Sequence, residues 1–343
     1  MISCVDIKQR FDEAQFANLL INLLDRSYEV DDDLIHVTTS IGSASYPDDT
    51  TNIERLMSCA EFARGSAKHS SNTCTYSAYS EDDMPKLQRK FMIEKKLQEV
   101  DYDRDFRMCY QPQISVETGE LVGLEALIRW TDSDIGTVEP EELIPIAEEM
   151  GIMSNLGEWV LTESLFQISK WNENYGKDLS IGVNISASQL EEENFAEQVM
   201  DMIANTGVKS EWVDFEVNEA VAIEYGRRIR NSINRLRKEN VTFSVDDFGS
   251  GYTSFSRMID FHFDCIKISE ELIHRLASSS DAQVVVKSII DMAHGMNLKV
   301  TAEGVEQQEV MNIIRPMGCD VVQGFLFGGA LPADEFEATW LQK

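Results

Sequence analysis

Eight apolar runs of strand length follow one another between residues 106 and 328, and stretches with helical periodicity separate most of them. The runs are FRMCYQPQIS (106–115), LVGLEALIRW (121–130), LSIGVNIS (179–186), VDFEVNE (213–219), TFSVDDFG (242–249), CIKIS (265–269), KVTAEGVE (299–306) and VVQGFLFG (321–328). Alternating strands and helices predict a parallel α/β fold. Eight such units in about 240 residues favour a (β/α)₈ TIM-like barrel, which usually needs about 250. A doubly wound open sheet is the alternative, but no G-x-G-x-x-G follows the first run to indicate a dinucleotide site.

Polar side chains stand at or near the carboxyl end of nearly every run. One acidic residue in such a place is ordinarily a helix cap or a surface residue, but seven consecutive runs that end this way are hard to explain by capping. The carboxyl ends of barrel strands converge on one face, where active sites of this fold lie. We therefore expect a functional site from these residues: Glu125, Asn184, Glu216, Asp246 with Asp247, Lys267, Glu303 and Gln323.

The adjacent pair Asp246 and Asp247 indicates the chemistry of this site. Side-by-side carboxylates repel, and one of them holds a proton unless a cation lies between them. A polar turn would also explain the pair, since Asp and Gly are ordinary turn residues. Together with the other carboxylates and the Asn184 amide, however, they form an all-oxygen set that suits Mg²⁺ or Mn²⁺. Two such ions with a shared carboxylate are a recurrent solution for phosphoester hydrolysis.

Two cationic side chains belong to the same set of strands. Lys267 could orient a nucleophilic water or stabilise charge on a phosphate, or it could form a salt bridge with a neighbouring acid. Arg129, two residues after Leu127, could bind a phosphate through two hydrogen bonds. The alternative interpretation is that Arg129 is an ordinary surface residue.

The charge and cysteine content exclude several classes of protein. Thirty basic and 60 acidic residues give a net charge of −30, which argues against long nucleic acids as partners. Six cysteines without C-x-x-C spacing predict reduced thiols in a cytoplasmic protein. No stretch approaches the roughly 18 apolar residues that span a bilayer, and no signal peptide opens the chain, so we expect no membrane contact.

The first 80 residues have a different organisation, in which we expect helix, strand, helix and strand. The polar stretch SEDDMPK (80–86) leads into a long amphipathic helix. We therefore divide the chain into an α/β segment at 1–80, a linker helix at 81–105 and the barrel at 106–343. The first segment is thin for an independent domain, which favours the remainder of a larger one.

The motifs along the barrel resemble the EAL domains, phosphodiesterases for the bacterial second messenger cyclic di-GMP. The resemblance covers residues from about 87 to the end, in the family's order. It is carried by YQPQ, LEALIRW, the Asn of VNIS, FEVNE, DDFGSGY, KIS, AEGVE and QGF. It implies a barrel with an atypical antiparallel first strand, an EAL-mediated homodimer as one mode of assembly, and metal-dependent opening of cyclic di-GMP to linear pGpG.

The resemblance also implies a role for each matching position. Glu125, Asn184, Glu216 and Asp246 would hold one metal, and Asp246, Asp247 and Glu303 a second. Lys267 would assist the attacking water, and Glu303 would handle the proton. The remaining positions would contact the ligand or ordered water (Gln111, Leu127, Arg129, Gln323) or support the loops (Glu219, Ser269, Glu306).

Three positions depart from the family pattern. Asn218 stands for the usual Thr, and Gly329-Ala330 stands for the common Arg-Pro. Ser269 replaces the Asp of K-I-D, which lies near the second metal in the family, so this departure bears on the catalytic rate.

Residues 34–79 resemble the C-terminal half of a GGDEF domain, the diguanylate cyclase module, through VTTSIGSASYPDD and AEFARGSAKHSSNTCTYSA. The G-G-D-E-F motif itself does not occur, so we expect no cyclase activity from a truncated or degenerate domain. Three hypotheses for the barrel follow. They are an active cyclic di-GMP phosphodiesterase, a catalytically silent EAL domain that acts as a cyclic di-GMP receptor, and an unrelated metal-dependent barrel hydrolase.

Overall fold

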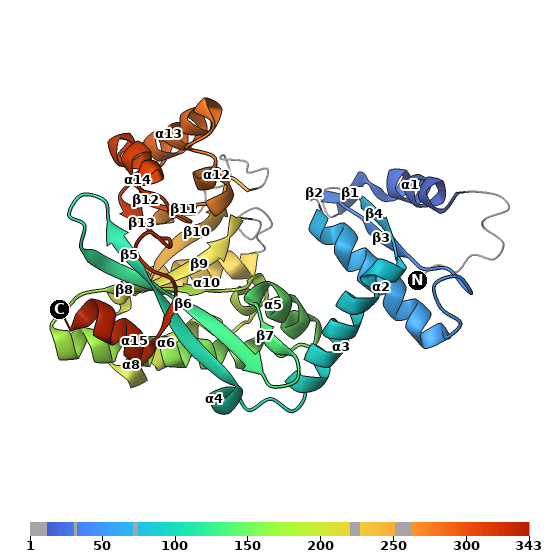
Figure 1. Cartoon of the computed structure of the whole chain (residues 1–343), viewed down its shortest axis with the longest axis horizontal. Helices are drawn as coiled ribbons and strands as arrows, with labels where there is room; N and C mark the ends of the chain where they lie inside the picture. The colour runs from blue at the N-terminus through green and yellow to red at the C-terminus, as the bar shows by residue number, and fades with distance from the viewer. Residues whose placement is uncertain (1–11, 31–32, 71–74, 220–226, 251–262, 343) are drawn as a thin grey trace. The chain divides into compact units, whose positions relative to one another are not determined.

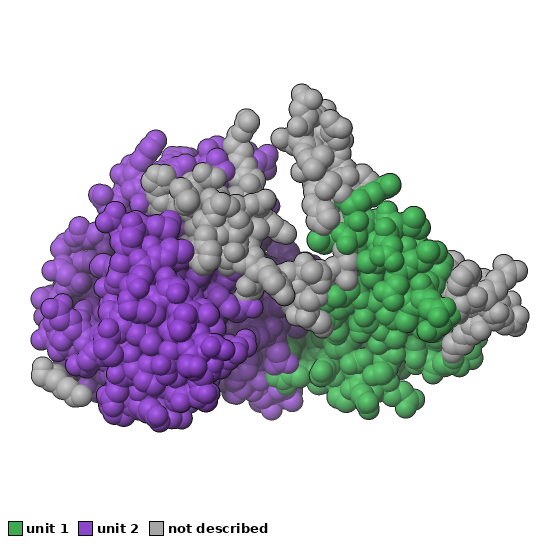
Figure 2. Space-filling view, turned by 90° about the horizontal axis from the view of Figure 1, so that it is seen from above, with its two compact units in different colours: residues 1–95 green, residues 96–343 purple. Residues whose placement is uncertain are grey.

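The computed structural model describes residues 12–30, 33–70, 75–219, 227–250 and 263–342. The chain divides into two compact units, Met1–Lys95 and Lys96–Lys343, which Figure 2 colours separately. No helix in the described ranges is long and apolar enough to cross a bilayer.

The second unit contains a closed barrel of eight strands, as expected. Neighbouring strands pair in the order β5-β6-β8-β9-β10-β11-β12-β13, and β13 pairs with β5 to close the ring. Their bounds are β5 Phe106–Ser115, β6 Leu121–Asp132, β8 Ser180–Asn184, β9 Val213–Asn218, β10 Thr242–Phe248, β11 Cys265–Ile268, β12 Lys299–Ala302 and β13 Val321–Val322.

The first strand of the barrel, β5, runs against the others. It pairs antiparallel with both β6 and β13. The other seven strands, β6 and β8 to β13, pair parallel with one another. The five-residue connection from Ser115 to Leu121 explains this direction, since a parallel pair needs a crossover of a dozen or more residues. Figure 1 shows the resulting long β5–β6 hairpin.

Strand β9 shows why the barrel interior is polar where the strands end. Val213, Phe215 and Val217 are fully buried, and Glu216 lies between them in sequence. Because successive side chains point to opposite faces of a strand, the apolar residues pack outward and Glu216 points inward. The same alternation gives the other strands an apolar face toward the helices.

Helices follow most of the parallel strands and cover the barrel (Figure 1). The α-helices of the unit are α4 Tyr102–Asp105, α5 Pro140–Glu149, α6 Met153–Tyr175, α7 Ala187–Glu191, α8 Phe195–Thr206, α10 Arg227–Lys238, α12 Glu270–His274, α13 Ser280–Gly295, α14 Gln308–Ile314 and α15 Ala333–Phe336. Short η elements span Ser210–Trp212, Arg315–Met317 and Glu337–Leu341. Helices α6 and α8 end at Gly176 and Gly207, whose left-handed conformation suits a C-terminal cap.

Strand β6 continues beyond the barrel. It pairs with β8 from Gly123 to Ala126, and its distal half pairs with the short strand β7 (Gly136–Val138). The ammonium of Lys96 lies 3.1 Å from the carboxylate of Asp132 at the end of β6. Lys96 belongs to α3 (Met84–Leu97), so this ion pair joins the end of that helix to the β6–β7 hairpin.

The first unit is built around the parallel pair β3 (Ser40–Ser43) and β4 (Thr75–Ala78), which α2 (Ile53–Ser70) connects. Cys59, Ala63, Tyr79 and Leu87 form its small buried cluster. The remaining elements are α1 Glu13–Leu24, β1 Arg26–Val30, β2 Asp33–Val37 and η2 Glu81–Asp83.

The first of the two strands expected in residues 1–80, across LIHVTTSIGSASY (34–46), is interrupted. The structure has β2 and β3 there, with Thr38 and Thr39 between them, and β2 forms an antiparallel pair with β1. The strands β7 and β14 (Leu331–Pro332) were also not predicted, because two or three residues are too few to show a period.

Candidate active site

Lys267 lies at the centre of the carboxyl ends of the barrel strands. Its side chain is 1% exposed, and its ammonium contacts carboxylates from four other parts of the barrel. The distances from Nζ are 2.6 Å to Glu216, 2.8 Å to Glu303, 3.0 Å to Asp246 and 3.3 Å to Glu125. The salt bridge considered for Lys267 is thus present, and it is made with the acids that were predicted to bind metal.

Side-chain amides surround the carboxylate of Glu125. Asn184 at the end of β8 donates to Oε1 over 2.9 Å, and Gln323 after β13 donates to Oε2 over 2.6 Å. The same Nε2 of Gln323 also donates to Gln111 on β5 over 3.0 Å. Four of the predicted residues therefore form one hydrogen-bonded group at this side of the barrel.

A bulge brings the two adjacent aspartates to the site. Val245 and Phe248 of β10 pair with Ile266 and Ile268 of β11, so two residues of β10 lie opposite one residue of β11. Those two residues are Asp246 and Asp247, and Asp247 has a φ of 54°, a left-handed conformation. A bulge next to an active site re-aims side chains, and here Asp246 turns to Lys267 while Asp247 stays exposed beside it.

The carboxylates outnumber the positive charge, and their pKa values reflect it. Burial and the charge of Glu125 raise the pKa of Glu216 well above its usual range. Burial, reinforced by the charge of Asp246 and only partly offset by Lys267, raises the pKa of Glu303 to about 8. Burial alone would lower the pKa of Lys267, but the charges of Asp246 and Glu125 raise it instead.

Glu125 differs from these acids. Burial would raise its pKa, yet the charge of Lys267 and the hydrogen bonds from Gln323 and Asn184 lower it below the usual value. Glu125 is therefore ionised at neutral pH, whereas Glu303 holds a proton there.

This set of side chains fits one or more hard divalent cations. Every donor is an oxygen, and one ammonium leaves the cluster with an excess of negative charge. Oε1 of Glu216 is buried and accepts no hydrogen bond from any described residue. A buried carboxylate oxygen without a partner is costly, and a cation would remove that cost.

Two of the three predicted loop-supporting residues, Glu219 and Ser269, lie close to the bulge. Glu219, just after β9, accepts a hydrogen bond of 2.9 Å from the backbone of Gly249. Ser269 precedes α12 and is 2% exposed, and its hydroxyl oxygen has no hydrogen-bond partner among the described residues. Gly251 and Tyr252 of the DDFGSGY motif lie outside the described residues.

Arg129 and Leu127 stand apart from the carboxylate cluster. Both are partly exposed on β6, beyond Glu125. Within the described ranges, the guanidinium of Arg129 donates to the neighbouring carbonyl of Ile128 over 2.9 Å. The structure thus leaves both side chains partly exposed and outside the hydrogen-bonded group around Glu125, and their contact with a ligand stays a prediction.

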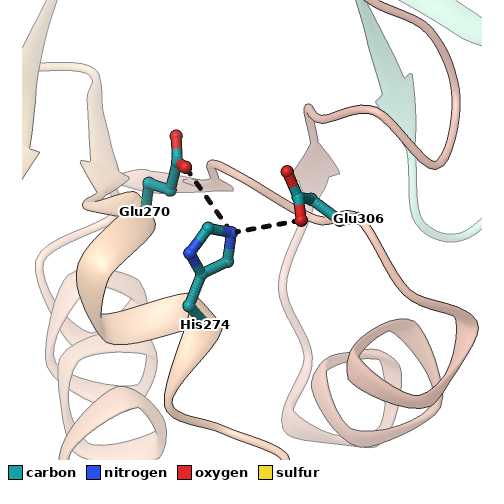
Figure 3. A group of neighbouring side chains, drawn as sticks. All are labelled: Glu270, His274 and Glu306. Atoms are coloured by element: carbon teal, nitrogen blue, oxygen red, sulfur yellow. Dashed lines mark ion pairs between the residues drawn. The ribbon is translucent and has the colours of Figure 1, made fainter.

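Glu306 belongs to a second, exposed group with Glu270 and His274. Figure 3 shows the three side chains pointing toward one another from α12 and from the segment after β12. Nε2 of His274 lies 3.5 Å from Glu270 and 3.8 Å from Glu306. One ion could contact all three groups, but exposed ion pairs of this kind are also common without one.

Sequence reasoning missed Gln113, which donates a hydrogen bond of 3.1 Å to Oε1 of Gln323. The available signal was its position, two residues after Gln111 in the same strand, because such residues share a face. The pair Glu270 and His274 was also missed, although its four-residue spacing on a helix could have indicated it.

Comparison with known proteins places these features in a family. Residues 94–330 match the family model described as the EAL domain. The chain is 31% identical over 306 residues to the biofilm architecture maintenance protein MbaA of Vibrio cholerae, which covers 89% of this chain and 38% of that protein. It is 28% identical over 335 residues to the bifunctional diguanylate cyclase/cyclic di-GMP phosphodiesterase MucR of Pseudomonas aeruginosa, with 98% and 49% covered. The chain thus spans less than half the length of these curated relatives.

Solved structures resemble the barrel. The PaMucR phosphodiesterase in a c-di-GMP complex has a TM-score of 0.68 and 30% identity, covering 71% of this chain and 99% of that one. The FimX EAL domain of Pseudomonas aeruginosa bound to c-di-GMP has a TM-score of 0.64 over 70% of this chain and 96% of that one, and at 20% identity it supports the fold alone.

Proposed function

The chain belongs to the EAL domain family, and from this premise we propose that it is a metal-dependent phosphodiesterase that hydrolyses cyclic di-GMP to linear pGpG. The observation that carries the proposal is the cluster of carboxylates around Lys267, which collects oxygen ligands from four parts of the barrel. The relative MucR and the solved PaMucR complex support the ligand through their names.

The ions in this proposal are Mg²⁺ or Mn²⁺. Glu125, Asn184, Glu216 and Asp246 would hold one ion, and Asp246, Asp247 and Glu303 would hold a second. Bound there, such ions supply a more acidic water and offset negative charge on the phosphate.

The protein's own residues would perform the remaining work. In the hydrolysis, the oxygen of a water molecule bonds to phosphorus and the water gives up a proton. The bond between phosphorus and the 3′ oxygen of the ribose breaks, and that 3′ oxygen takes up a proton. Lys267, fixed by its carboxylates, presents positive charge where negative charge develops. Glu303, whose pKa is about 8 in the metal-free protein, would handle the proton. Gln111, Leu127 and Arg129 would orient the ligand.

The test is to incubate the purified chain with cyclic di-GMP and either Mg²⁺ or Mn²⁺, and to separate the products by chromatography. We expect linear pGpG to accumulate when metal is present, and its formation to stop after exhaustive chelation. Turnover that survives chelation would exclude the metal-dependent mechanism.

The same experiment separates the enzyme from a silent receptor. A receptor would bind cyclic di-GMP, measured by calorimetry, and form no linear product with either metal. Cyclic di-GMP that neither binds nor reacts would refute both hypotheses, and the family match already excludes the third, an unrelated barrel hydrolase.

We also propose that the first unit is the remainder of a GGDEF-type domain. The match of MucR, whose name includes a diguanylate cyclase, over 98% of this chain supports this assignment. Because no G-G-D-E-F motif occurs in the sequence, we expect incubation with GTP to yield no cyclic di-GMP.

A further inference from the structure

The Gln323 amide can face Glu125 with either end, and only one end is compatible with a carboxylate. The ionised Glu125 only accepts hydrogen bonds, so it needs the NH₂ group of Gln323. In the structure Nε2 does face Glu125, at 2.6 Å. A reversed amide would place an oxygen against the carboxylate, and the two negatively polarised groups would repel each other.

The neighbours of Gln323 determine this orientation. Gln111 donates to the carbonyl of Gly328 over 3.3 Å and therefore presents its own oxygen to Nε2 of Gln323. On the other side, Gln113 donates to Oε1 of Gln323 over 3.1 Å. Gln113 is the only described side chain that donates to this oxygen, so it holds the end of the amide that must point away from Glu125.

The barrel leaves room for Gln113 at Gly123 of β6. A Cβ at Gly123 would lie 2.9 Å from the side-chain oxygen of Gln113, closer than real contacts allow. Glu125 follows two residues later on the same strand, so its side chain faces the same way as position 123. The space at Gly123 thus lets Gln113 reach Gln323 directly beneath Glu125.

We propose that Gln113 is a positioning residue that fixes the Gln323 amide and, through it, the carboxylate of Glu125. The inference rests on the proposed function, in which Glu125 holds a metal ion. Gln113 would act through its hydrogen bond to Gln323, which in turn donates to Glu125. Partners of metal ligands commonly contribute 10- to 100-fold to metal affinity.

The experiment is a double-mutant cycle with Mn²⁺ binding as its readout, measured by titration of the free ion in the whole chain. Gln113→Met keeps the length of the side chain and removes the amide. We expect it to weaken Mn²⁺ binding about tenfold, and the turnover lost at low metal to return as Mn²⁺ saturates. In a Gln323→Met background the same substitution should have no further effect, since its target is gone.

Two controls separate positioning from a general structural role. Gln308→Met removes an exposed amide on α14, which pairs with Asn312, and should leave Mn²⁺ affinity unchanged. Thermal melts of all variants show whether each barrel is folded. A role of Gln113 in packing alone would weaken binding equally in both backgrounds.

Equal costs in the two backgrounds, or an unchanged Mn²⁺ affinity in Gln113→Met, would overturn the inference. A chain that binds Mn²⁺ with this coupling but forms no pGpG would refute the proposed hydrolysis and uphold the positioning role. A chain that binds no Mn²⁺ would overturn both.

Discussion

Lys267 carries one positive charge among four ion-paired carboxylates, and this imbalance determines what single substitutions do at the residue scale. Ion pairs that are buried gain little net stability, because desolvation offsets the attraction. A buried cluster with excess negative charge is therefore retained at a cost to folding. We infer that its benefit lies in binding cations.

Glu125 is the residue whose loss should be most damaging. Glu125→Gln removes the negative charge but keeps the shape of the side chain, so we expect turnover of cyclic di-GMP to fall about 100-fold or more. This exceeds the 10- to 100-fold loss that is usual for residues that only hydrogen-bond a metal ligand. Chromatography of the linear product measures the rate. Glu120→Gln, an exposed change on the same hairpin, is the matched control, and equal rates for the two variants would show that the site lies elsewhere.

Ser269 should limit the activity of the protein when Mg²⁺ is scarce. An Asp there would add negative charge next to the bulge, where a neutral and unpartnered hydroxyl now stands. Ser269→Asp should therefore raise the rate at limiting Mg²⁺ and have a smaller effect at saturating Mg²⁺. The measurement is a metal titration of both proteins at fixed cyclic di-GMP, and superimposable activation curves would dismiss Ser269 as the limitation.

Much of the candidate site could be predicted from single residues, for a physical reason. Polar residues that end apolar runs must lie at one edge of a parallel sheet, so Glu125, Asn184, Glu216 and Lys267 were expected together. Gln113 could not be assigned from its strand alone, because its role depends on Gln323, 210 residues away. The hydrogen bond of Glu219 to Gly249 likewise depends on how two strands end.

At the scale of elements, the site depends on strand ends that approach closely. Gly324, directly after β13, lies against the backbone of Val305, and its φ is 154°. Val305 and Gln323 are joined there by a backbone hydrogen bond of 3.0 Å. This contact fixes the position of the Gln323 backbone, from which its side chain reaches Glu125.

Gly324→Ala should disturb this contact, because its Cβ would collide with the Val305 backbone, which cannot rotate away. Overpacking of this kind costs about 1–3 kcal/mol, and we expect the melting temperature to fall by about 5 °C. Thermal melts followed by circular dichroism measure it. Gly295→Ala, in the last turn of α13 where a Cβ meets no atom within 4 Å, should change little, and a matching loss in both variants would contradict the argument.

The order of elements and the closed barrel were predicted from the sequence. Eight apolar runs with intervening helices indicated eight strands, and that number favoured a barrel over a doubly wound open sheet. The antiparallel direction of β5 followed from the family resemblance, although the short Ser115–Leu121 connection also requires it. The bulge in β10 depends on the pairing with β11 and leaves no trace in the pattern of apolar residues.

At the scale of the whole molecule, the acidic site couples stability to pH and metal. The folded pKa of Glu303, about 8, exceeds its ordinary value of 4.5. A raised pKa means that the stability this group contributes is present below pH 4.5 and is lost as the pH rises through 8. The metal-free protein should therefore melt at a lower temperature at pH 8 than at pH 5.

Divalent metal should reverse that loss. Mn²⁺ at about 100 times its dissociation constant adds about 2.7 kcal/mol, which corresponds to a rise of roughly 4–5 °C in melting temperature for a chain of this size. The rise should be larger at pH 8, because at pH 5 the ion must displace protons. Melts at both pH values with EDTA or Mn²⁺ test this, and Glu303→Gln should reduce the difference between them.

The continuity of β6 has a mechanical consequence. One uninterrupted strand holds Glu125 within the barrel and, seven residues further along, Asp132, whose carboxylate pairs with Lys96 of α3. At about 3.3 Å per residue, the two positions lie about 23 Å apart along a strand that β5 pairs with as far as Trp130 and that β7 pairs with from Trp130 to Asp132. We therefore expect a small tilt of the β6–β7 hairpin to shift the Glu125 carboxylate without passing through any loop.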